Sequence, residues 1–129
     1  TQTELEQIAN ICDCPGMVES MLAAENAEMI PLVNKLLDNI SQVTLSNLLK
    51  ITKKFKINEN SEGMDIPLFI NCLQHFLYKK FLNTGEYKYY RFYAETINTK
   101  SALRSITTNK LYSIDNLLLK GWKIWNCGN

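Results

Sequence analysis

Residues 65–85 read Asp-Ile-Pro-Leu-Phe-Ile-Asn-Cys-Leu-Gln-His-Phe-Leu-Tyr-Lys-Lys-Phe-Leu-Asn-Thr-Gly, and this stretch contains the signals that decide the fold. Asp65 is a typical N-cap residue, and Pro67 suits the first turn of the helix that follows it. Gly85 marks the end of this helix, because glycine often terminates helices. Apolar side chains cover most of its circumference, which is typical of a buried, central helix. Four residues are expected at the centre of the core: Phe69, Leu73, Phe76 and Leu77.

Two short helices are expected before residue 25, because apolar residues recur there at helical spacing. Thr3 and Glu6 have the spacing of a capping box for the first helix. The chain breaks at residues 13–16, and Pro15 suits the first position of the second helix. The expected apolar face of the second helix consists of Met17, Val18, Met21 and Leu22.

Two further helices are expected between Asn26 and a polar loop at residues 58–63. Asn26 is a candidate N-cap for the first of them, and Thr44 is a candidate N-cap for the second. The first has an apolar face formed by Ile30, Val33, Leu36, Leu37 and Ile40. The second has its face formed by Leu45, Leu48, Leu49, Thr52 and Phe55.

The segment after Gly85 is rich in aromatic residues and permits two interpretations. The alternation of aromatic residues over positions 87–93 suggests a strand, whereas apolar positions that continue to Ile106 favour a long helix. We expect the helix, with an irregularity near residues 98–99. A last helix is expected after Thr108, and a glycine at position 121 is expected to weaken or end it.

These segments together predict an all-α fold, a compact bundle of six or seven helices. The length of 129 residues is the usual size of one domain, so residues 1–129 are expected to form a single helical domain. The chain begins at Thr1 and not at Met. A domain taken from a longer protein is the simplest explanation, and a processed N-terminus is the alternative.

The charge balance argues against a dedicated nucleic-acid-binding protein. The chain has 14 Lys and Arg against 13 Asp and Glu, for a net charge of +1, whereas nucleic-acid binders usually carry a strong basic excess. The sequence has no apolar run of about 20 residues and no signal-peptide pattern, so neither a membrane span nor secretion is expected. We expect a cytoplasmic protein whose four cysteines are reduced thiols.

Cysteine and histidine residues raise the question of a zinc site. Cys12-x-Cys14 and Cys72-x-x-His75 supply four side chains of the right types, but their spacing is not that of a zinc finger. His75 is the only histidine and lies in the apolar helix, which favours a structural role over catalysis. The glycines form no phosphate-binding loop. We therefore expect no catalytic residue, no cofactor and no metal ion.

Two groups of surface residues are candidates for binding. Four lysines within residues 50–56 form a basic stretch, which is interpreted first as a solvated helix face and second as a phosphate contact. Tyr89 and Tyr93 are candidate interface residues, since tyrosine is enriched at protein interfaces. Trp122 is interpreted first as a staple for the C-terminal segment and second as an interface residue.

A short motif at residues 11–18 resembles a known family. It reads Ile-Cys-Asp-Cys-Pro-Gly-Met-Val and is similar to the Gly-Ser-Pro-Gly-x-Ala element of bacterial clamp-loader delta-prime subunits of DNA polymerase III. Pro15 and Gly16 match that element, whereas Cys14 replaces its serine and Val18 replaces its alanine. The order of a long apolar helix, an aromatic-rich helix and a Leu/Asn-rich helix is also similar. The last of these departs from the family's Asn-Leu-Asp pattern.

The resemblance implies a fold and a function. Residues 25–129 would be the helical collar domain, and residues 1–24 would be the tail of the preceding ATPase-like domain. The domain would be non-catalytic, and it would assemble the loader ring for DNA replication by contacting the other clamp-loader subunits. The enzyme would be the parent complex, DNA polymerase III.

Two other functions remain open at this point. The second interpretation is a small helical regulator, from a virus or an intracellular microbe, that binds an amphipathic partner helix in a groove. The weakest interpretation is a ligand-binding or metal-dependent helical bundle.

Overall fold

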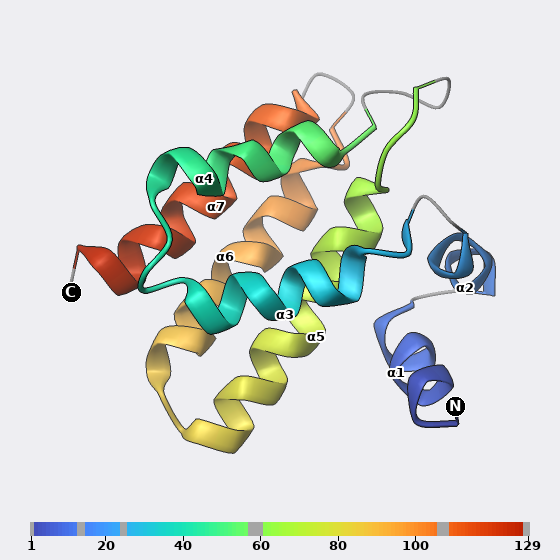
Figure 1. Cartoon of the computed structure of the whole chain (residues 1–129), viewed down its shortest axis with the longest axis horizontal. Helices are drawn as coiled ribbons and strands as arrows, with labels where there is room; N and C mark the ends of the chain where they lie inside the picture. The colour runs from blue at the N-terminus through green and yellow to red at the C-terminus, as the bar shows by residue number, and fades with distance from the viewer. Residues whose placement is uncertain (1, 13–14, 24–25, 57–60, 106–108, 128–129) are drawn as a thin grey trace.

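The computed structural model of the chain describes residues 2–12, 15–23, 26–56, 61–105 and 109–127, apart from the side chains of residues 2–5, 15 and 16. Within these ranges all regular elements are helices (Figure 1). The elements in chain order are α1 (Gln2–Ile11), α2 (Pro15–Leu22), α3 (Met29–Asn39), α4 (Leu45–Leu49), the 3-10 helix η2 (Lys50–Lys54), α5 (Ile66–Thr84), α6 (Tyr87–Ala102) and α7 (Lys110–Asn126). The predicted all-α fold is confirmed.

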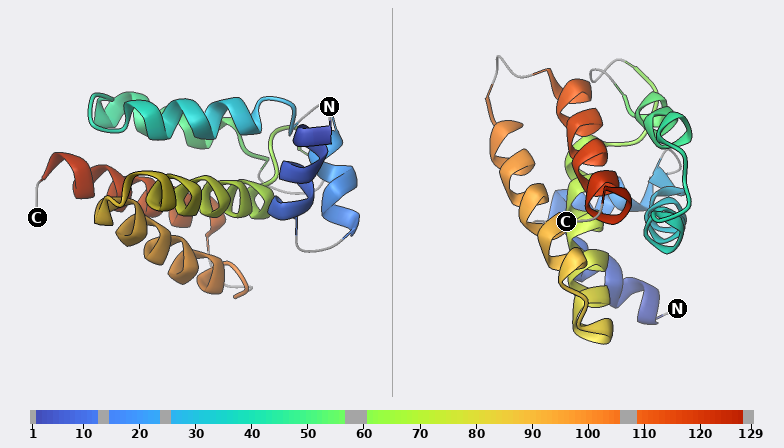
Figure 2. Two further views of the ribbon diagram at one scale, coloured as in Figure 1. Left: turned by 90° about the horizontal axis from the view of Figure 1, so that it is seen from below. Right: turned by 90° about the vertical axis from the view of Figure 1, so that its left-hand side faces the viewer.

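The helices form three layers, which Figure 2 shows from two sides. Helices α5 and α7 lie in the middle layer, α3 and α4 cover one side, and α6 covers the other. Helix α5 contacts α1, α3 and α6, while α7 contacts α4, η2 and α6. The apolar helix identified in the sequence is therefore central, as predicted.

The signals at both ends of α5 act as the sequence predicts. The Asp65 carboxylate accepts a hydrogen bond from the Leu68 N–H at 3.2 Å, so it caps the helix N-terminus. Gly85 has a φ of 70° and donates its N–H to the Phe81 carbonyl at 2.8 Å. This left-handed conformation suits glycine, which has no Cβ. The four residues expected at the core centre are all buried: Phe69, Leu73, Phe76 and Leu77.

Helix α4 begins as predicted but is shorter than expected. The Thr44 side chain accepts a hydrogen bond from the Asn47 N–H at 3.2 Å and caps it. After Leu49 the chain tightens into η2, and the Thr52 hydroxyl donates to the Leu49 carbonyl at 2.8 Å. The predicted loop that follows lies partly outside the described residues, at positions 58–60.

Asn26 is not the N-cap of α3, contrary to the prediction. Helix α3 begins at Met29, and its N-cap position is Glu28. The Asn26 side chain is buried, accepts a hydrogen bond from the Asp65 N–H at 3.0 Å and donates one to the Ser20 carbonyl at 2.6 Å. An amide group both donates and accepts, so it can bridge two backbone segments in a buried position. Asn26 therefore ties the chain after α2 to the start of α5.

The first two helices pack at one end of the bundle, where α1 contacts α5. Ile11 and Met21 are buried, but Leu22 is exposed, so the predicted apolar face of α2 is wrong at that residue. A short helix that covers only the end of a bundle has a narrow buried face. The predicted capping box at Thr3 lies outside the described side chains.

Two predictions for the last helices are also wrong. Helix α6 continues through residues 98–99 without an irregularity and ends at Ala102. Helix α7 continues through Gly121 to Asn126, so the expectation that this glycine ends the helix is wrong, and the expectation that it weakens the helix stays a prediction. Gly121 is buried, and a Cβ at this position would collide with the ring of Phe92. Glycine is therefore present because α6 and α7 approach closely there, and this packing outweighs its weak helix propensity.

Candidate protein-interaction surface

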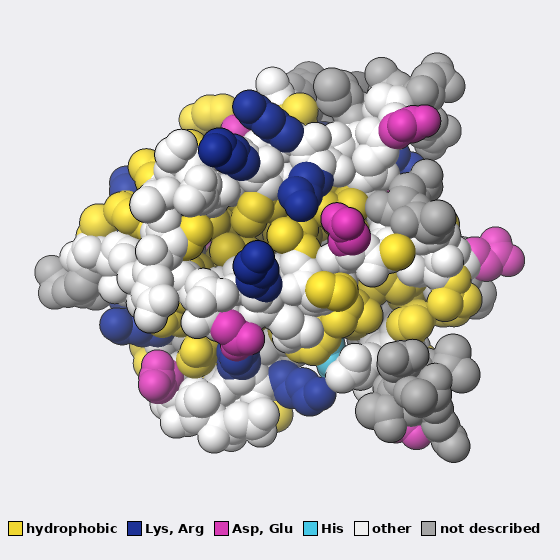
Figure 3. Space-filling model, in the orientation of Figure 1, with side chains coloured by type: hydrophobic (Ala, Val, Ile, Leu, Met, Phe, Trp, Pro, Cys, Tyr) yellow, Lys and Arg dark blue, Asp and Glu magenta, His cyan; other side chains and the backbone are white. Residues whose placement is uncertain are grey.

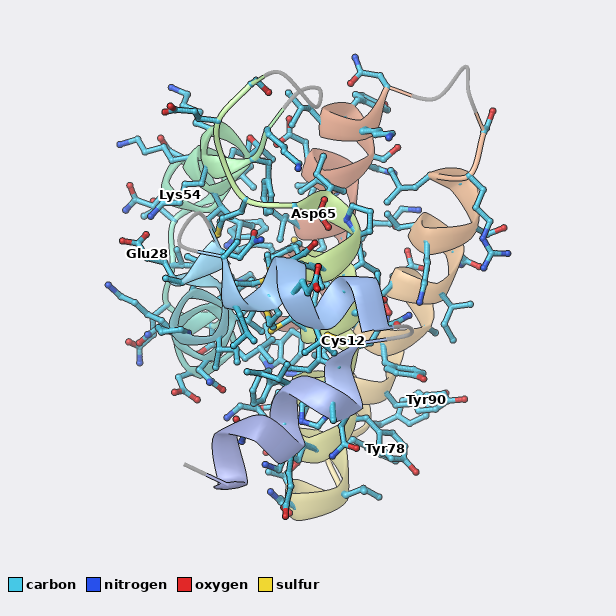
Figure 4. The ribbon with its side chains drawn as sticks, turned by 90° about the vertical axis from the view of Figure 1, so that its right-hand side faces the viewer. Cys12, Glu28, Lys54, Asp65, Tyr78 and Tyr90 are labelled. Atoms are coloured by element: carbon cyan, nitrogen blue, oxygen red, sulfur yellow. The ribbon has the colours of Figure 1, made fainter. Side chains whose placement is uncertain are left out.

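Four tyrosines in ring contact form a continuous patch across α5 and α6, which we name the tyrosine surface: Tyr78, Tyr87 and Tyr90, which are exposed, and Tyr93, which is half-buried against the core. Tyr78 is 49% exposed, Tyr87 is 64% exposed and Tyr90 is 42% exposed. In Figure 4, Tyr78 and Tyr90 both project outward from the edge of the bundle. Leu82, near the end of α5, is 63% exposed.

Helical spacing explains how the sequence builds this surface. Tyr87, Tyr90 and Tyr93 are three residues apart, so they lie along one face of α6. The ring centroids of Tyr87 and Tyr90 are 5.6 Å apart, and those of Tyr90 and Tyr93 are 6.2 Å apart, both in stacked geometry. Tyr78 of α5 joins this row through Tyr93, at a centroid distance of 6.0 Å. The rings hold one another in place, which reduces the entropy that a partner would have to remove.

Charged residues adjoin the tyrosine surface in a groove between α6 and α7. Arg91, Lys120 and Lys123 line this groove together with Tyr87 and Tyr90. Glu95 also lines it, and its carboxylate lies 3.3 Å from the Lys120 Nζ. The edge of the tyrosine surface is therefore polar and basic. An apolar or aromatic centre with a polar rim is the usual anatomy of a protein interface.

The three interface residues proposed from the sequence lie in different places. Tyr93 belongs to the tyrosine surface. Tyr89 is half-buried and packs on Trp125 of α7, at a centroid distance of 5.1 Å. Trp122 is also half-buried, and its Nε1–H donates to the Val43 carbonyl at 2.9 Å. Tyr89 and Trp122 therefore contribute to packing within the bundle, and the structure does not bring them together with Tyr93.

Sequence reasoning left three of the most exposed aromatic residues out of the candidate interface: Tyr78, Tyr87 and Tyr90. The spacing of positions 87, 90 and 93 was a usable signal, because it places three tyrosines on one face of a helix. Tyr78 had no comparable signal, since its neighbour in space lies 15 positions further along the chain. Its place depends on how α5 packs against α6.

His75 and Cys72 are held in environments that suppress charge. Burial lowers the pKa of His75 below 6.5, and the nearby positive charge of Lys79 lowers it further. The buried Nε2 atom of His75 has no hydrogen-bond partner among the described residues. Burial also raises the pKa of the Cys72 thiol to about 12, with a smaller contribution from Cys12. A thiol with such a pKa is a poor nucleophile at neutral pH.

The cysteine, histidine and lysine residues considered for metal or phosphate contacts are not part of the tyrosine surface. In the described part of the chain, no group of three or more His, Cys, Asp or Glu residues could hold a metal ion, and Cys14 lies outside that part. Within the basic stretch at residues 50–56, the Lys54 Nζ lies 3.9 Å from a Glu28 carboxylate oxygen. The Lys56 Nζ lies 3.9 Å from Asp65. Lys50 and Lys53 are exposed.

Comparison of the chain with protein-family models, curated proteins and solved structures gives no match. Among the described helices, none combines the length and the apolar character that crossing a membrane requires.

Proposed function

We propose that this chain is a non-catalytic protein-interaction domain that binds a helical partner through the tyrosine surface. The single observation that carries the proposal is the row of tyrosines in ring contact across α5 and α6, three of which are between 42% and 64% exposed. Tyrosine buries a large area at low entropic cost, and it is among the residues most often found in the energetic centre of interfaces. The basic rim formed by Arg91 and Lys123 adds complementarity to an acidic edge on the partner.

The proposed partner follows from the resemblance to clamp-loader delta-prime subunits. The Pro15–Gly16 match and the order of helices that follows it support a collar domain. In this proposal the partners are the other clamp-loader subunits of DNA polymerase III in the cytoplasm. The domain supplies contact area for the ring and takes no part in bond-making, and it binds DNA only weakly. The enzyme is the parent complex.

The test is size-exclusion chromatography with light scattering on this chain mixed with candidate collar domains from the same source. We expect a complex at low micromolar concentration. The double variant Tyr87→Ser/Tyr90→Ser should lose the complex while it keeps its helical circular dichroism spectrum. Tyr112→Ser is the matched control, because Tyr112 is 69% exposed and lies on α7, outside the tyrosine surface.

Three results would count against the proposal. Failure to form a complex with any collar domain, at concentrations well above micromolar, would remove the clamp-loader partner. An equal loss of binding in Tyr112→Ser would show that the effect does not depend on the tyrosine surface. Unfolding of the double variant would show that Tyr87 and Tyr90 belong to the core, and Tyr90→Phe would then test the hydroxyl alone.

A further inference from the structure

A second hollow lies between α3 and α4, away from the tyrosine surface. It has a volume of about 520 Å³, and we name it the α3–α4 groove. Its lining residues are Leu32, Lys35, Leu36, Asn39, Gln42, Val43, Asn47 and Ile51. Figure 4 shows Lys54 and Glu28, which lie beside the groove, at the opposite edge of the molecule from Tyr78 and Tyr90.

The floor of the groove is apolar. Leu32 and Leu36 are one helical turn apart on α3, and Ile51 faces them from η2. Figure 3 shows hydrophobic side chains at the bottom of a hollow in the face that α3 and α4 form, with Lys or Arg side chains and also Asp or Glu side chains around it. The floor contains no aromatic residue on which nucleic-acid bases would stack.

The turn that closes one end of the groove is held in place by α7. The Trp122 Nε1–H donates to the Val43 carbonyl at 2.9 Å, and the Asn126 side-chain amide donates to the Ile40 carbonyl at 3.0 Å. These bonds attach the connection between α3 and α4 to the middle layer of the bundle. The groove is therefore built into the fold before any partner arrives, which lowers the entropic cost of binding.

The rim of the groove is basic. Lys35 lines it directly, and η2 carries Lys50, Lys53 and Lys54 beside Ile51. The Glu28 carboxylate lies 3.9 Å from the Lys54 Nζ, so it offsets one of these positive charges. The lining contains one lysine and no acidic residue, and three more lysines lie on η2, which contributes Ile51 to the lining, so lysine is locally in excess beside the groove.

We propose that the α3–α4 groove binds an acidic amphipathic helix of a partner protein. The apolar face of that helix packs on Leu32, Leu36 and Ile51, and its carboxylates face the lysines of the rim. Helix α3 has 11 residues, so the groove accommodates roughly three turns of helix, about 16 Å. Apolar anchors at positions i, i+4 and i+7 would meet such a floor. This inference goes beyond the proposed function, because the groove shares no residue with the tyrosine surface.

The first arm of the test measures binding of a fluorescein-labelled peptide by fluorescence anisotropy. The peptide has about 14 residues, with leucine at positions i, i+4, i+7 and i+11 and mainly glutamate elsewhere. A scrambled peptide of the same composition is its control. We expect the amphipathic peptide to bind at least about tenfold more tightly than the scrambled peptide, with affinity that falls as salt rises.

The second arm uses charge reversal on the protein. Lys35→Glu/Lys53→Glu should weaken peptide binding by about tenfold or more, since two attractive contacts become repulsive. The matched control is Lys88→Glu/Lys110→Glu, which reverses two exposed lysines outside the groove and should change affinity by less than about twofold. Leu32→Gln tests the floor, and circular dichroism checks that each variant keeps its helicity.

The third arm locates the peptide by amide NMR shifts. Signals of Lys35, Gln42 and Asn47 should move on binding, while those of Tyr87 and Tyr90 stay in place. The proposal is overturned if the peptide does not bind at millimolar concentration, if the scrambled peptide binds equally well, or if both charge-reversal pairs lose the same affinity. It is also overturned if single-stranded oligothymidine binds as tightly as the peptide and loses affinity in the same variants, because the rim would then select phosphate.

Discussion

Helices α5 and α6 lie side by side, but they differ in how deeply their aromatic residues are buried. Helix α5 buries nine residues, including Phe69 and Phe76. Helix α6 buries only two, Phe92 and Thr96, although its sequence is richer in aromatic residues. The difference arises from position, since α5 lies in the middle layer and α6 covers one side of it. Aromatic content alone therefore does not indicate a core helix.

This difference in burial also separates residues that stabilise the fold from residues that are available for binding. Phe69 is fully buried and contacts the ring of Phe55 at a centroid distance of 4.8 Å. The Tyr90 ring contacts the rings of Phe81, Tyr87 and Tyr93, and 42% of its surface stays exposed. Removing the first side chain opens a cavity, whereas removing the second does not.

The largest expected effect is on the core side of the comparison. Phe69→Ala should lower the free energy of unfolding by about 3–5 kcal/mol, the usual cost of deleting a buried aromatic side chain. Tyr90→Ala should lower it by about 1 kcal/mol or less, because the site is at the surface. Urea unfolding followed by circular dichroism measures both. Equal losses in the two variants would show that α6 belongs to the core as much as α5 does.

A smaller effect is expected where α6 meets α7. Gly121→Ala should lower the free energy of unfolding by about 1–3 kcal/mol, because the added methyl group collides with the Phe92 ring. The loss should appear even though alanine is the better helix former. Phe92→Leu in the same chain should restore part of the loss, which a double-mutant cycle measures. A stabilising Gly121→Ala would mean that α6 and α7 do not approach closely at this point.

The smallest effect concerns pH. Because the pKa of His75 is lower in the folded chain than in the unfolded chain, the unfolded chain binds more protons below about pH 6.5. The free energy of unfolding should therefore fall as the pH drops from about 6.5 towards the folded-state pKa. His75→Gln should reduce this slope, as measured by unfolding between pH 5 and pH 7. A slope that is unchanged in His75→Gln would assign it to carboxylates instead.

Local signals predicted much of the fold. Asp65, Thr44 and Gly85 act through contacts within three or four residues, so their roles can be inferred from sequence. The central position of α5 could also be inferred from the sequence, because a helix that is apolar nearly all round has to be buried on most sides. In each of these cases the residue pattern within one segment was enough to predict the structure.

The errors occurred where contacts between distant segments decide the outcome. Asn26 has the chemistry of an N-cap, but it bonds to the Asp65 backbone 39 positions away. Glycine has a weak helix propensity, so Gly121 was expected to weaken or end α7. The Phe92 ring lies so close to Gly121 that this position has no room for a side chain. The tyrosine surface has the same origin, since Tyr78 reaches Tyr93 only after α5 and α6 have packed. A single sequence carries no direct signal for such contacts.

Fluorine NMR of the chain labelled with 3-fluorotyrosine tests the central claim most directly. The six tyrosines give one signal each, which single Tyr→Phe variants assign. On addition of the partner collar domain, we predict that the signals of Tyr78, Tyr87 and Tyr90 shift or broaden, while the signal of Tyr112 stays unchanged. A spectrum in which Tyr112 responds and the tyrosine surface does not would contradict the account.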